Sequence, residues 1–301
     1  MKNKIFFSKE NLNENGYCVV ERIVSKEILE NAQDSFCKIK KSVKRGDYPY
    51  YRIYDDCAFN KNISGIELVF HSKILTQPII DFIVNSKVLE IAKQQLGDEI
   101  ELDLCRYHLT ESFSHVGNWH RDEDINHKNN SIQINVFLFD EKGLQIINNS
   151  HKKKNTLEEE IIKKTPHASL AVSKWISTRA GEILVFDPAV LHRGISQEPR
   201  ANIHFRFKKK NRAFQNKIDL NYKNLDIPKE WIFVLENSPK AVDEKVLKPY
   251  SFRKDYKSIF YRFLRKVVHN FIFFLPLHSK IYYYFNIWPN LKLRKIFNIK
   301  T

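Results

Sequence analysis

The sequence predicts a mainly β fold of β-sandwich or jelly-roll type with flanking helices, followed by a basic, aromatic and helical C-terminal extension. Three observations lead to this prediction: helical spacing in the first third of the chain, two-residue alternation over about 99–207, and a change of composition after about residue 210. Short strands joined by irregular loops are typical of sandwiches and jelly rolls rather than of βαβ sheets. The 301 residues therefore divide into a predicted domain at 1–210 and an extension at 211–301.

Helices are predicted to dominate the first third of the chain. An apolar run at Tyr17–Val20 indicates one short strand there. Ser25 can cap a helix that ends before Gly46. The apolar face of this helix would carry Ile28, Leu29, Ala32, Phe36 and Ile39. A second helix is predicted over 86–96, because its apolar residues share one side and Gly97 can end it.

From Glu101 onward the apolar residues recur every second position, which indicates strands. In the first strand, Leu102, Leu104 and Arg106 alternate with Asp103, Cys105 and Tyr107. Further alternating segments span 131–138 and 202–207, and 183–186 is a short run of the buried type. Residues two apart on a strand point to the same face, so each segment has one apolar and one polar side.

Composition excludes some classes of protein and favours an anionic partner. Hydrophobic residues make up 43%, so a sizeable core can form and global disorder is excluded. The formal net charge is +15, and residues 251–301 supply ten of these charges, since that stretch holds eleven basic residues and one acid. Such a balance favours nucleic acid, an acidic membrane surface or an acidic substrate.

Neither the cysteines nor the apolar runs indicate export. Cys18, Cys37, Cys57 and Cys105 match no zinc or disulfide pattern and are interpreted as reduced thiols. The N-terminus lacks the apolar run of a signal peptide, and 271–275 is far shorter than the ~20 residues that span a bilayer. A cytoplasmic location is therefore predicted. A further expectation is that the protein attaches peripherally to the inner face of the cytoplasmic membrane.

Three residues form a candidate metal site. His120 and Asp122 are two apart, so in extended backbone both side chains point to the same side. His192 follows the buried-type strand and a turn, and can supply a third ligand. Two histidines and one carboxylate on one face of an octahedral ion are the facial triad of non-haem Fe(II) oxygenases. The open positions would take a bidentate 2-oxo acid and O2.

The co-substrate 2-oxoglutarate also needs an anchor for its distal carboxylate. Arg200 begins the last alternating strand, and a guanidinium binds a carboxylate through two parallel hydrogen bonds, which Lys cannot do. Arg206 lies on the same strand face and is the rival anchor. Further candidates for lining the cofactor cavity are Arg106, which shares a strand face with His108, and the polar pair Gln133 and Asn135. The alternatives for these residues are surface or core positions.

On these segments the sequence resembles the phytanoyl-CoA dioxygenase family of Fe(II)/2-oxoglutarate-dependent oxygenases. The resemblance runs from Gly16 to about Phe207 and rests on "GYCVVERIVSKEILENA", "WHRDED", "GLQIINNSHK" and "GEILVFDPAVLHRG". It implies a double-stranded β-helix, iron ligands at His120, Asp122 and His192, and Arg200 as the anchor. Halogenating relatives replace the carboxylate ligand by a small residue, so Asp122 favours hydroxylation.

The substrate is predicted from charge rather than from the resemblance, which does not reach the last ninety residues. The favoured interpretation is an oxygenase that acts on an anionic surface-glycan or glycolipid precursor at the inner membrane, for example a lipopolysaccharide inner-core sugar. A soluble small-molecule or acyl-CoA hydroxylase is the alternative enzyme, and a non-catalytic binding module is the alternative from another class. The basic, aromatic segment 251–301 can contact anionic lipid or simply pack as a helical subdomain. Nucleic acid is the less favoured partner.

Overall fold

The structure of the chain is a computed structural model. It describes residues 7–45, 51–53, 63–71, 74–110, 115–127, 130–196, 199–210, 222, 224–238 and 241. All of them belong to one compact unit, Met1–Ser251. The basic segment 251–301 lies outside the described residues, so the predictions made for it rest on sequence alone.

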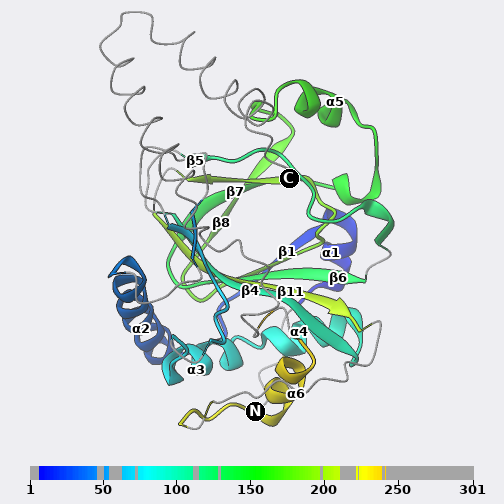
Figure 1. Cartoon of the computed structure of the whole chain (residues 1–301). Helices are drawn as coiled ribbons and strands as arrows, with labels where there is room; N and C mark the ends of the chain where they lie inside the picture. Colours follow the sequence, from blue (N-terminus) through cyan, green and yellow to red (C-terminus); the bar gives the residue numbers. More distant parts are fainter. Residues whose placement is uncertain are drawn as a thin grey trace, which may run out of the picture. The chain divides into compact units, whose positions relative to one another are not determined.

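Two antiparallel sheets form the centre of the described part of the chain, and helices pack around them (Figure 1). The larger sheet has the order β1-β9-β6-β11-β4-β3-β2, and the smaller has the order β5-β10-β7-β8. The strands of the larger sheet are β1 (Tyr17–Val20), β2 (Tyr51–Ile53), β3 (Ile63–Glu67), β4 (Ile100–Thr110), β6 (Ser131–Phe137), β9 (Ile183–Phe186) and β11 (Arg200–Lys209). Those of the smaller sheet are β5 (His115–Val116), β7 (Glu141–Ile147), β8 (Ser173–Thr178) and β10 (His192–Ser196).

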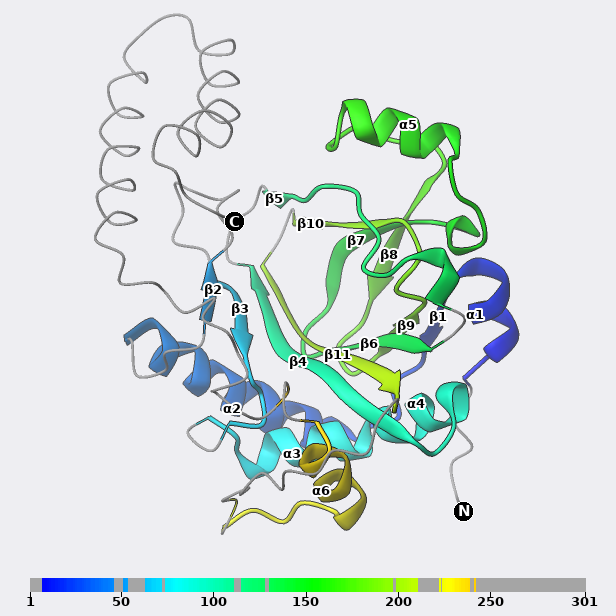
Figure 2. The same cartoon turned by 45° about the vertical axis from the view of Figure 1, so that its right-hand side comes forward.

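The order of the strands along the chain is that of a double-stranded β-helix. Strands β4, β6, β9 and β11 belong to the larger sheet, whereas β5, β7, β8 and β10 belong to the smaller one. The chain therefore crosses between the sheets as it winds, and the two sheets face each other across a common interior (Figure 2). This arrangement confirms the predicted jelly-roll class.

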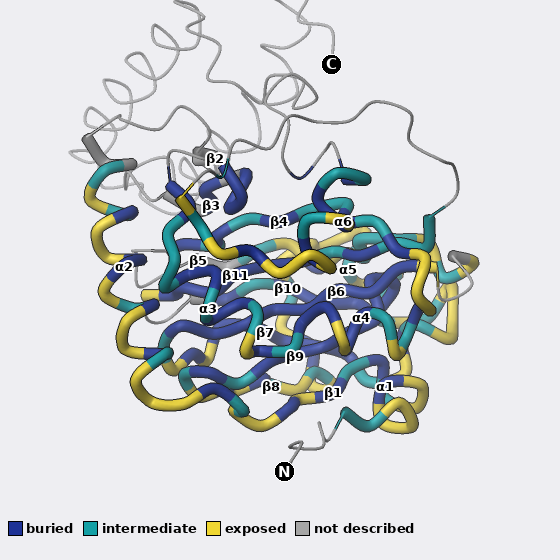
Figure 3. The backbone as a smooth tube through the Cα atoms, turned by 90° about the horizontal axis from the view of Figure 1, so that it is seen from below, coloured by how far each residue is buried: buried dark blue, intermediate teal, exposed yellow. Residues whose placement is uncertain are grey.

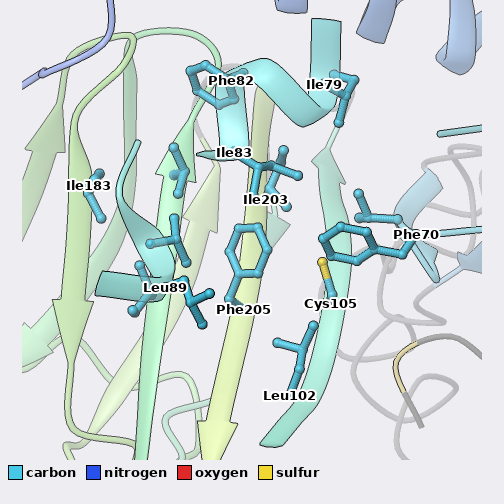
Figure 4. Close-up of a cluster of buried hydrophobic side chains, with 14 of the residues drawn as sticks. Phe70, Ile79, Phe82, Ile83, Leu89, Leu102, Cys105, Ile183, Ile203 and Phe205 are labelled. Atoms are coloured by element: carbon cyan, nitrogen blue, oxygen red, sulfur yellow. The ribbon is translucent and has the colours of Figure 1, made fainter. Parts of the chain in front are cut away.

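Helices cover the outer face of the larger sheet. They are α2 (Lys26–Arg45), α3 (Gln77–Asn85), α4 (Val88–Leu96) and α6 (Lys229–Glu236); α1 (Lys9–Asn15) and α5 (Leu157–Lys164) lie elsewhere. Apolar side chains of α3 and α4, among them Phe82 and Leu89, pack on Ile203 and Phe205 of β11 (Figure 4). Phe205 is fully buried, so its truncation to Ala would cost about 3–5 kcal/mol of stability.

Of the helices in the first third of the chain, α2 and α4 were predicted from the sequence, and α1 and α3 were not. Ser25 caps α2 as expected, since its hydroxyl accepts a hydrogen bond from the Ile28 N–H at 3.3 Å. The helix predicted over 86–96 begins at Val88 instead, because the buried Ser86 is the C-cap of α3. Figure 3 shows α2 alternating between buried and exposed turns, as its spacing predicts, while β6, β9 and β11 are buried along most of their length.

The predicted faces of β4 are wrong at its start. The register against β11 shifts between Arg206 and Phe207, so Leu104 pairs with Arg206 while Leu102 pairs with Phe207. The irregularity puts Leu102 in the same apolar core as Cys105 and Tyr107, although simple alternation placed it on the opposite face. Beyond it the alternation holds, and Arg106 and His108 share the other face.

Strand β11 lies at the centre of the larger sheet and separates two environments. Its odd-numbered residues, Ile203, Phe205 and Phe207, belong to the core under the helices. Its even-numbered residues face the interior between the sheets; they are Arg200, Asn202, His204, Arg206 and Lys208. A polar strand face with this degree of burial indicates that the interior holds a site rather than ordinary core.

Part of the predicted C-terminal extension packs on the larger sheet. Trp231 of α6 contacts Phe70, Phe205 and Phe207 at ring-centroid distances of 5.5, 6.1 and 6.4 Å. The Ser238 hydroxyl accepts a hydrogen bond from the Leu102 N–H at 2.7 Å. The described residues beyond 210 are thus tied to the β fold. Among all described residues, no helix is long and apolar enough to cross a membrane.

Candidate metal centre

The backbone brings the predicted ligand pair and the third ligand together. His120 and His192 form an antiparallel β-bridge, in which each N–H donates to the other's carbonyl at 3.0 Å. The Asp122 N–H donates to the Pro188 carbonyl at 2.8 Å, so the segment after His120 is held against the turn before His192. These contacts join segments about seventy positions apart in the sequence, and they fix the three Cα positions around one point.

The three side chains converge at this point. Asp122 Oδ1 lies 3.6 Å from His120 Nε2, and Asp122 Oδ2 lies 3.8 Å from His192 Nε2. One ligand atom from each residue lies within 4.8 Å of the others. Two neighbouring ligand atoms on one face of an octahedral ion, each bonded at about 2.1 Å, lie about 3.0 Å apart, so each measured pair has to close by less than about 1 Å to share an ion. Within the described part of the chain, this is the one group of three or more His, Cys, Asp or Glu residues placed to hold a metal ion.

Both imidazoles are oriented for metal binding. The Nδ1 atom of His120 lies 2.9 Å from the Asn118 carbonyl, and that of His192 lies 3.0 Å from the Val190 carbonyl. A carbonyl accepts, so each Nδ1 carries the proton and each Nε2 presents its lone pair to the centre. The sequence thus supplies ligand and orienting carbonyl two residues apart in both cases.

The electrostatics of the site keep His192 and Asp122 in their binding forms. Burial, together with the nearby His120, lowers the pKa of His192 to about 4, so its ring is neutral near pH 7. Burial acts to raise the pKa of Asp122, but neighbouring basic groups outweigh it and the net pKa is lowered. These groups are His192, Arg206, His120 and Arg106. A neutral imidazole and an ionised carboxylate are the forms that coordinate a cation.

Lowering the pH is expected to destabilise the metal-free protein in a defined window. His192 has a folded pKa of about 4 against an ordinary value of 6.5, and burial also lowers the pKa of His204 well below its usual range. The unfolded chain then binds more protons than the folded one between these values, so the free energy of unfolding falls as the pH falls from 6.5 toward 4. Urea unfolding at a series of pH values measures this.

A His192→Ala variant should show a shallower pH dependence over the same range, because one buried neutral imidazole is gone. A free energy of unfolding that stays flat from about pH 7 to about pH 4 would contradict the burial of these two rings as neutral groups.

Arg206 lies beside the metal ligands. Its Nη2 donates to Asp122 Oδ2, with which it forms an ion pair, and to Gln133 Oε1 at 2.8 Å. Gln133 Nε2 in turn donates to Asn135 Oδ1 at 3.3 Å. Gln133 and Asn135 are 3% and 2% exposed, so the polar side of β6 faces the interior, as the sequence indicated. Their role toward a cofactor stays a prediction.

Arg200 crosses the interior from the larger to the smaller sheet. Its Nε lies 2.5 Å from Glu141 Oε1 on β7, and Asn202 Nδ2 donates to Glu141 Oε2 at 2.7 Å. Two glycines make room for the guanidinium: a Cβ at Gly143 would lie 2.2 Å from Arg200 Nε, and one at Gly194 would lie 3.0 Å from Nη1. Glycine is therefore required at Gly143 while Arg200 keeps this position.

Unpaired polar atoms follow the inner face of β11. They are Arg200 Nη1, Asn202 Oδ1, both ring nitrogens of His204, and Arg206 Nε, which are buried and have no hydrogen-bond partner in the described part of the chain. A buried donor or acceptor without a partner costs about 1–3 kcal/mol, so a row of them indicates a polar ligand along this strand. The residues present therefore fit a co-substrate with a carboxylate at each end, such as 2-oxoglutarate.

Arg106 and His108 also lie along this wall. In the β4–β11 register, Arg106 pairs with His204 and His108 pairs with Asn202. The His108 and His204 rings are stacked, with centroids 4.8 Å apart and planes at 4°. The structure thus brings the half-buried Arg106 and His108 near the predicted site, and their role toward 2-oxoglutarate or substrate stays a prediction.

Arg121, between the two metal ligands, is a residue that the sequence analysis missed. It points to the opposite side from His120 and Asp122 and binds four groups. Its Nε and Nη2 contact Glu159 Oε1 at 3.0 and 2.9 Å. Its Nη1 donates to the Ser150 carbonyl at 2.6 Å and to the Ala189 carbonyl. Its Nη2 also donates to the Lys153 carbonyl at 2.9 Å. It joins the ligand pair to α5 and to the turn before His192.

We expect Arg121→Ala to weaken iron binding about tenfold or more, because orienting partners outside the ligand set typically contribute 10–100-fold to metal affinity. Titration of the metal-free protein with Fe(II) under anaerobic conditions measures the change. Arg179→Ala, at an exposed arginine, is the matched control. Unchanged affinity in Arg121→Ala would limit Arg121 to packing.

Trp119 belongs to the core rather than to an open pocket. It is 4% exposed, its Nε1 donates to the Ala168 carbonyl at 2.9 Å, and the Arg193 guanidinium lies 4.7 Å from its ring centroid. Arg193 also donates to Gln145 Oε1 at 2.8 Å. This cluster supports the β-bridge from behind, since both residues adjoin a metal ligand in the sequence.

Comparisons with known proteins identify a family and a fold for this chain. A family model described as phytanoyl-CoA dioxygenase matches residues 12–197. No curated protein matches the chain in sequence. Among solved structures, EctD from S. alaskensis with 2-oxoglutarate and 5-hydroxyectoine has a TM-score of 0.53 at 18% identity, covering 80% of this chain and 88% of that one.

Two further structures share the fold. AviO1 from Streptomyces viridochromogenes Tue57 has a TM-score of 0.53 at 11% identity and covers 68% of this chain and 95% of its own. HygX from Streptomyces hygroscopicus, with nickel and 2-oxoglutarate bound, has a TM-score of 0.50 at 13% identity. That match covers 71% of this chain and 91% of HygX. At these identities the likeness is one of fold.

Proposed function

The chain belongs to the phytanoyl-CoA dioxygenase family, and on that premise we propose that it hydroxylates an aliphatic C–H bond of an anionic substrate. It is an oxidoreductase that depends on iron and 2-oxoglutarate. The observation that carries the proposal is the convergence of His120, Asp122 and His192 beside a row of unpaired polar atoms. Hydroxylation is favoured because the carboxylate ligand, Asp122, is present.

The protein's own residues divide the work. His120, Asp122 and His192 would hold Fe(II), which with 2-oxoglutarate and O2 supplies the oxidant for the C–H bond. Arg206 keeps the Asp122 carboxylate ionised and oriented through their ion pair. The inward-facing residues of β11 position the co-substrate.

The decisive experiment is anaerobic addition of Fe(II) and then 2-oxoglutarate to the metal-free protein. A charge-transfer band that appears only when both are present would support the assignment, and O2-dependent formation of succinate would establish turnover. A protein that binds 2-oxoglutarate without forming succinate under any condition would instead be the non-catalytic binding module.

The proposed substrate class rests on charge. The formal net charge of +15 and the basic groups beside the metal ligands, Arg106 and Arg206, favour an anionic molecule. Within that class we propose a surface-glycan or glycolipid precursor, with a lipopolysaccharide inner-core sugar as one candidate. A soluble small molecule or an acyl-CoA is the alternative. Succinate formation in the presence of each candidate, measured against the uncoupled rate, ranks them.

The C-terminal segment is proposed to contact an anionic membrane surface, with nucleic acid as the less favoured partner. Residues 251–301 carry ten excess positive charges and the aromatic run Tyr282-Tyr283-Tyr284-Phe285. Basic residues near an anionic leaflet contribute ~1 kcal/mol each, and aromatic residues favour the headgroup region. Attachment of this kind would be peripheral and reversible.

Vesicles rich in anionic lipid are expected to bind the full chain, neutral vesicles should bind it weakly, and added salt should release much of it, since salt screens exposed charges. Co-sedimentation measures the bound fraction. Deleting 251–301 should abolish vesicle binding but leave iron and 2-oxoglutarate binding, because the triad and both candidate anchors precede residue 210. Equal binding to neutral and anionic vesicles would contradict the electrostatic proposal.

A further inference from the structure

Glu141 is a buried carboxylate on the smaller sheet that the metal site does not use. Its side chain is 2% exposed, and the side chain of Arg200 opposite is 4% exposed. A buried carboxylate is strongly disfavoured unless charged or polar partners compensate it. Glu141 has two such partners on β11: Arg200 Nε at 2.5 Å on one oxygen and Asn202 Nδ2 at 2.7 Å on the other.

These two bonds determine which part of the guanidinium remains available. Glu141 takes the Nε side of Arg200, whereas Nη1 has no hydrogen-bond partner in the described part of the chain. Nη1 lies toward the smaller sheet, where a Cβ at Gly194 would approach to 3.0 Å. The other donors of a guanidinium lie in the same plane, so fixing Nε also fixes the direction of Nη1.

We propose that Glu141 is a positioning residue that orients Arg200 so that its unpaired Nη1 receives the distal carboxylate of 2-oxoglutarate. This inference rests on the proposed function and on Arg200 as the anchor. Asn202 completes the arrangement, because it holds the second oxygen of Glu141 and prevents the carboxylate from rotating toward Nη1. The sequence places Arg200 and Asn202 two apart on β11, so both face the same carboxylate.

A competing role for Glu141 predicts the opposite result. If its carboxylate occupied the place of the co-substrate's own carboxylate, it would inhibit binding, and its removal would increase affinity. Orientation is favoured because Glu141 engages Nε and leaves Nη1 unpaired, whereas a substitute for the ligand would satisfy the donors that the ligand uses.

The test compares Glu141→Gln and Glu141→Ala in the full chain, using two 2-oxo acids. 2-Oxopentanoate has the same carbon chain as 2-oxoglutarate but a methyl group in place of the distal carboxylate. Anaerobic titration of the Fe(II)-loaded protein gives a Kd for each acid from the charge-transfer band. Glu160→Gln, at an exposed glutamate of α5, is the matched control.

Glu141→Ala is expected to raise the Kd of 2-oxoglutarate about 30-fold or more, because one partner of a buried ion pair is lost. The Kd of 2-oxopentanoate should change less than about threefold, which also shows that the variant is folded. Glu141→Gln should preserve the selectivity for 2-oxoglutarate, since its amide oxygen can accept from Arg200 Nε and the Asn202 amide can turn to present Oδ1.

Three outcomes would overturn the inference. Tighter 2-oxoglutarate binding in both variants would identify Glu141 as a competitor, and equal weakening for both acids would make it a structural residue only. Unchanged binding in Glu141→Ala would remove it from the site. Failure of the proposed function is distinguishable, because the unmodified chain would then give no band with either acid.

Discussion

Replacing His120, Asp122 or His192 with Ala is expected to abolish iron-dependent conversion of 2-oxoglutarate to succinate and to leave a folded protein. Each residue supplies one of the three converging ligand atoms, and a facial triad has no fourth protein ligand to compensate. The loss in turnover should be at least about a thousandfold, since removal of an essential catalytic group typically costs several kcal/mol. Succinate formation and Fe(II) binding, measured on the same samples, test this.

Folding should survive in these variants for different reasons. His120 is exposed, so its truncation leaves no cavity, and the β-bridge to residue 192 uses only backbone atoms. His192→Ala removes a buried neutral imidazole that costs stability at low pH. Asp122→Ala leaves Arg206 without its ion-pair partner, so this variant is expected to be the least stable of the three.

His167→Ala is the matched control for the histidine variants, because this side chain is exposed and the Arg193 guanidinium binds the residue through its backbone carbonyl. Its turnover should equal that of the unmodified protein. Retention of coupled turnover in any one of the three alanine variants would remove that residue from the metal site.

The sequence predicted the metal site because its signal is local. His120 and Asp122 are two residues apart, so strand geometry brings both side chains to the same side, and His192 follows an apolar strand and a turn a few residues later. Similar local reasoning found β6 and β11 from their two-residue alternation and β9 from its short apolar run. Such features depend on neighbours within a few residues of one another.

Features that depend on distant contacts could not be predicted in this way. Glu141 reads as an ordinary charged residue at the start of a strand, and only the register of the two sheets brings it to Arg200, 59 positions later. Arg121 contacts carbonyls 29 to 68 positions away. The irregularity in β4 is likewise invisible in its sequence, because it is defined by the pairing with β11.

The choice between Arg200 and Arg206 as anchor shows how such contacts change an interpretation. Both face the interior from the same strand, so alternation could not separate them. Arg206 is bound to Asp122 and Gln133, which places it at the metal end of the site. Arg200 lies at the other end of β11; each arginine has one unpaired nitrogen, Nη1 in Arg200 and Nε in Arg206, so position rather than pairing separates them. A co-substrate that extends from the metal therefore favours Arg200.

We accordingly expect Arg200→Lys to raise the KM for 2-oxoglutarate far more than Arg206→Lys does. Loss of a two-bond contact to a desolvated carboxylate costs about 2–5 kcal/mol, which corresponds to roughly 30-fold or more in affinity. The lysine keeps the positive charge beside Glu141, so the buried ion pair persists and the variant should fold. Steady-state succinate formation over a range of 2-oxoglutarate concentrations gives KM and kcat for both variants.

Arg206→Lys serves as the control within the same strand, and its expected effect is on the metal rather than on the co-substrate. The shorter, less directional ammonium cannot hold Asp122 and Gln133 as the guanidinium does, so iron affinity should fall while the KM for 2-oxoglutarate changes little. 2-Oxopentanoate separates the two effects, because it lacks the carboxylate that Arg200 would bind and its use should be insensitive to Arg200→Lys. If Arg206→Lys instead raised the KM for 2-oxoglutarate more than Arg200→Lys, the anchor would be Arg206, and Arg200 would serve only to neutralise Glu141.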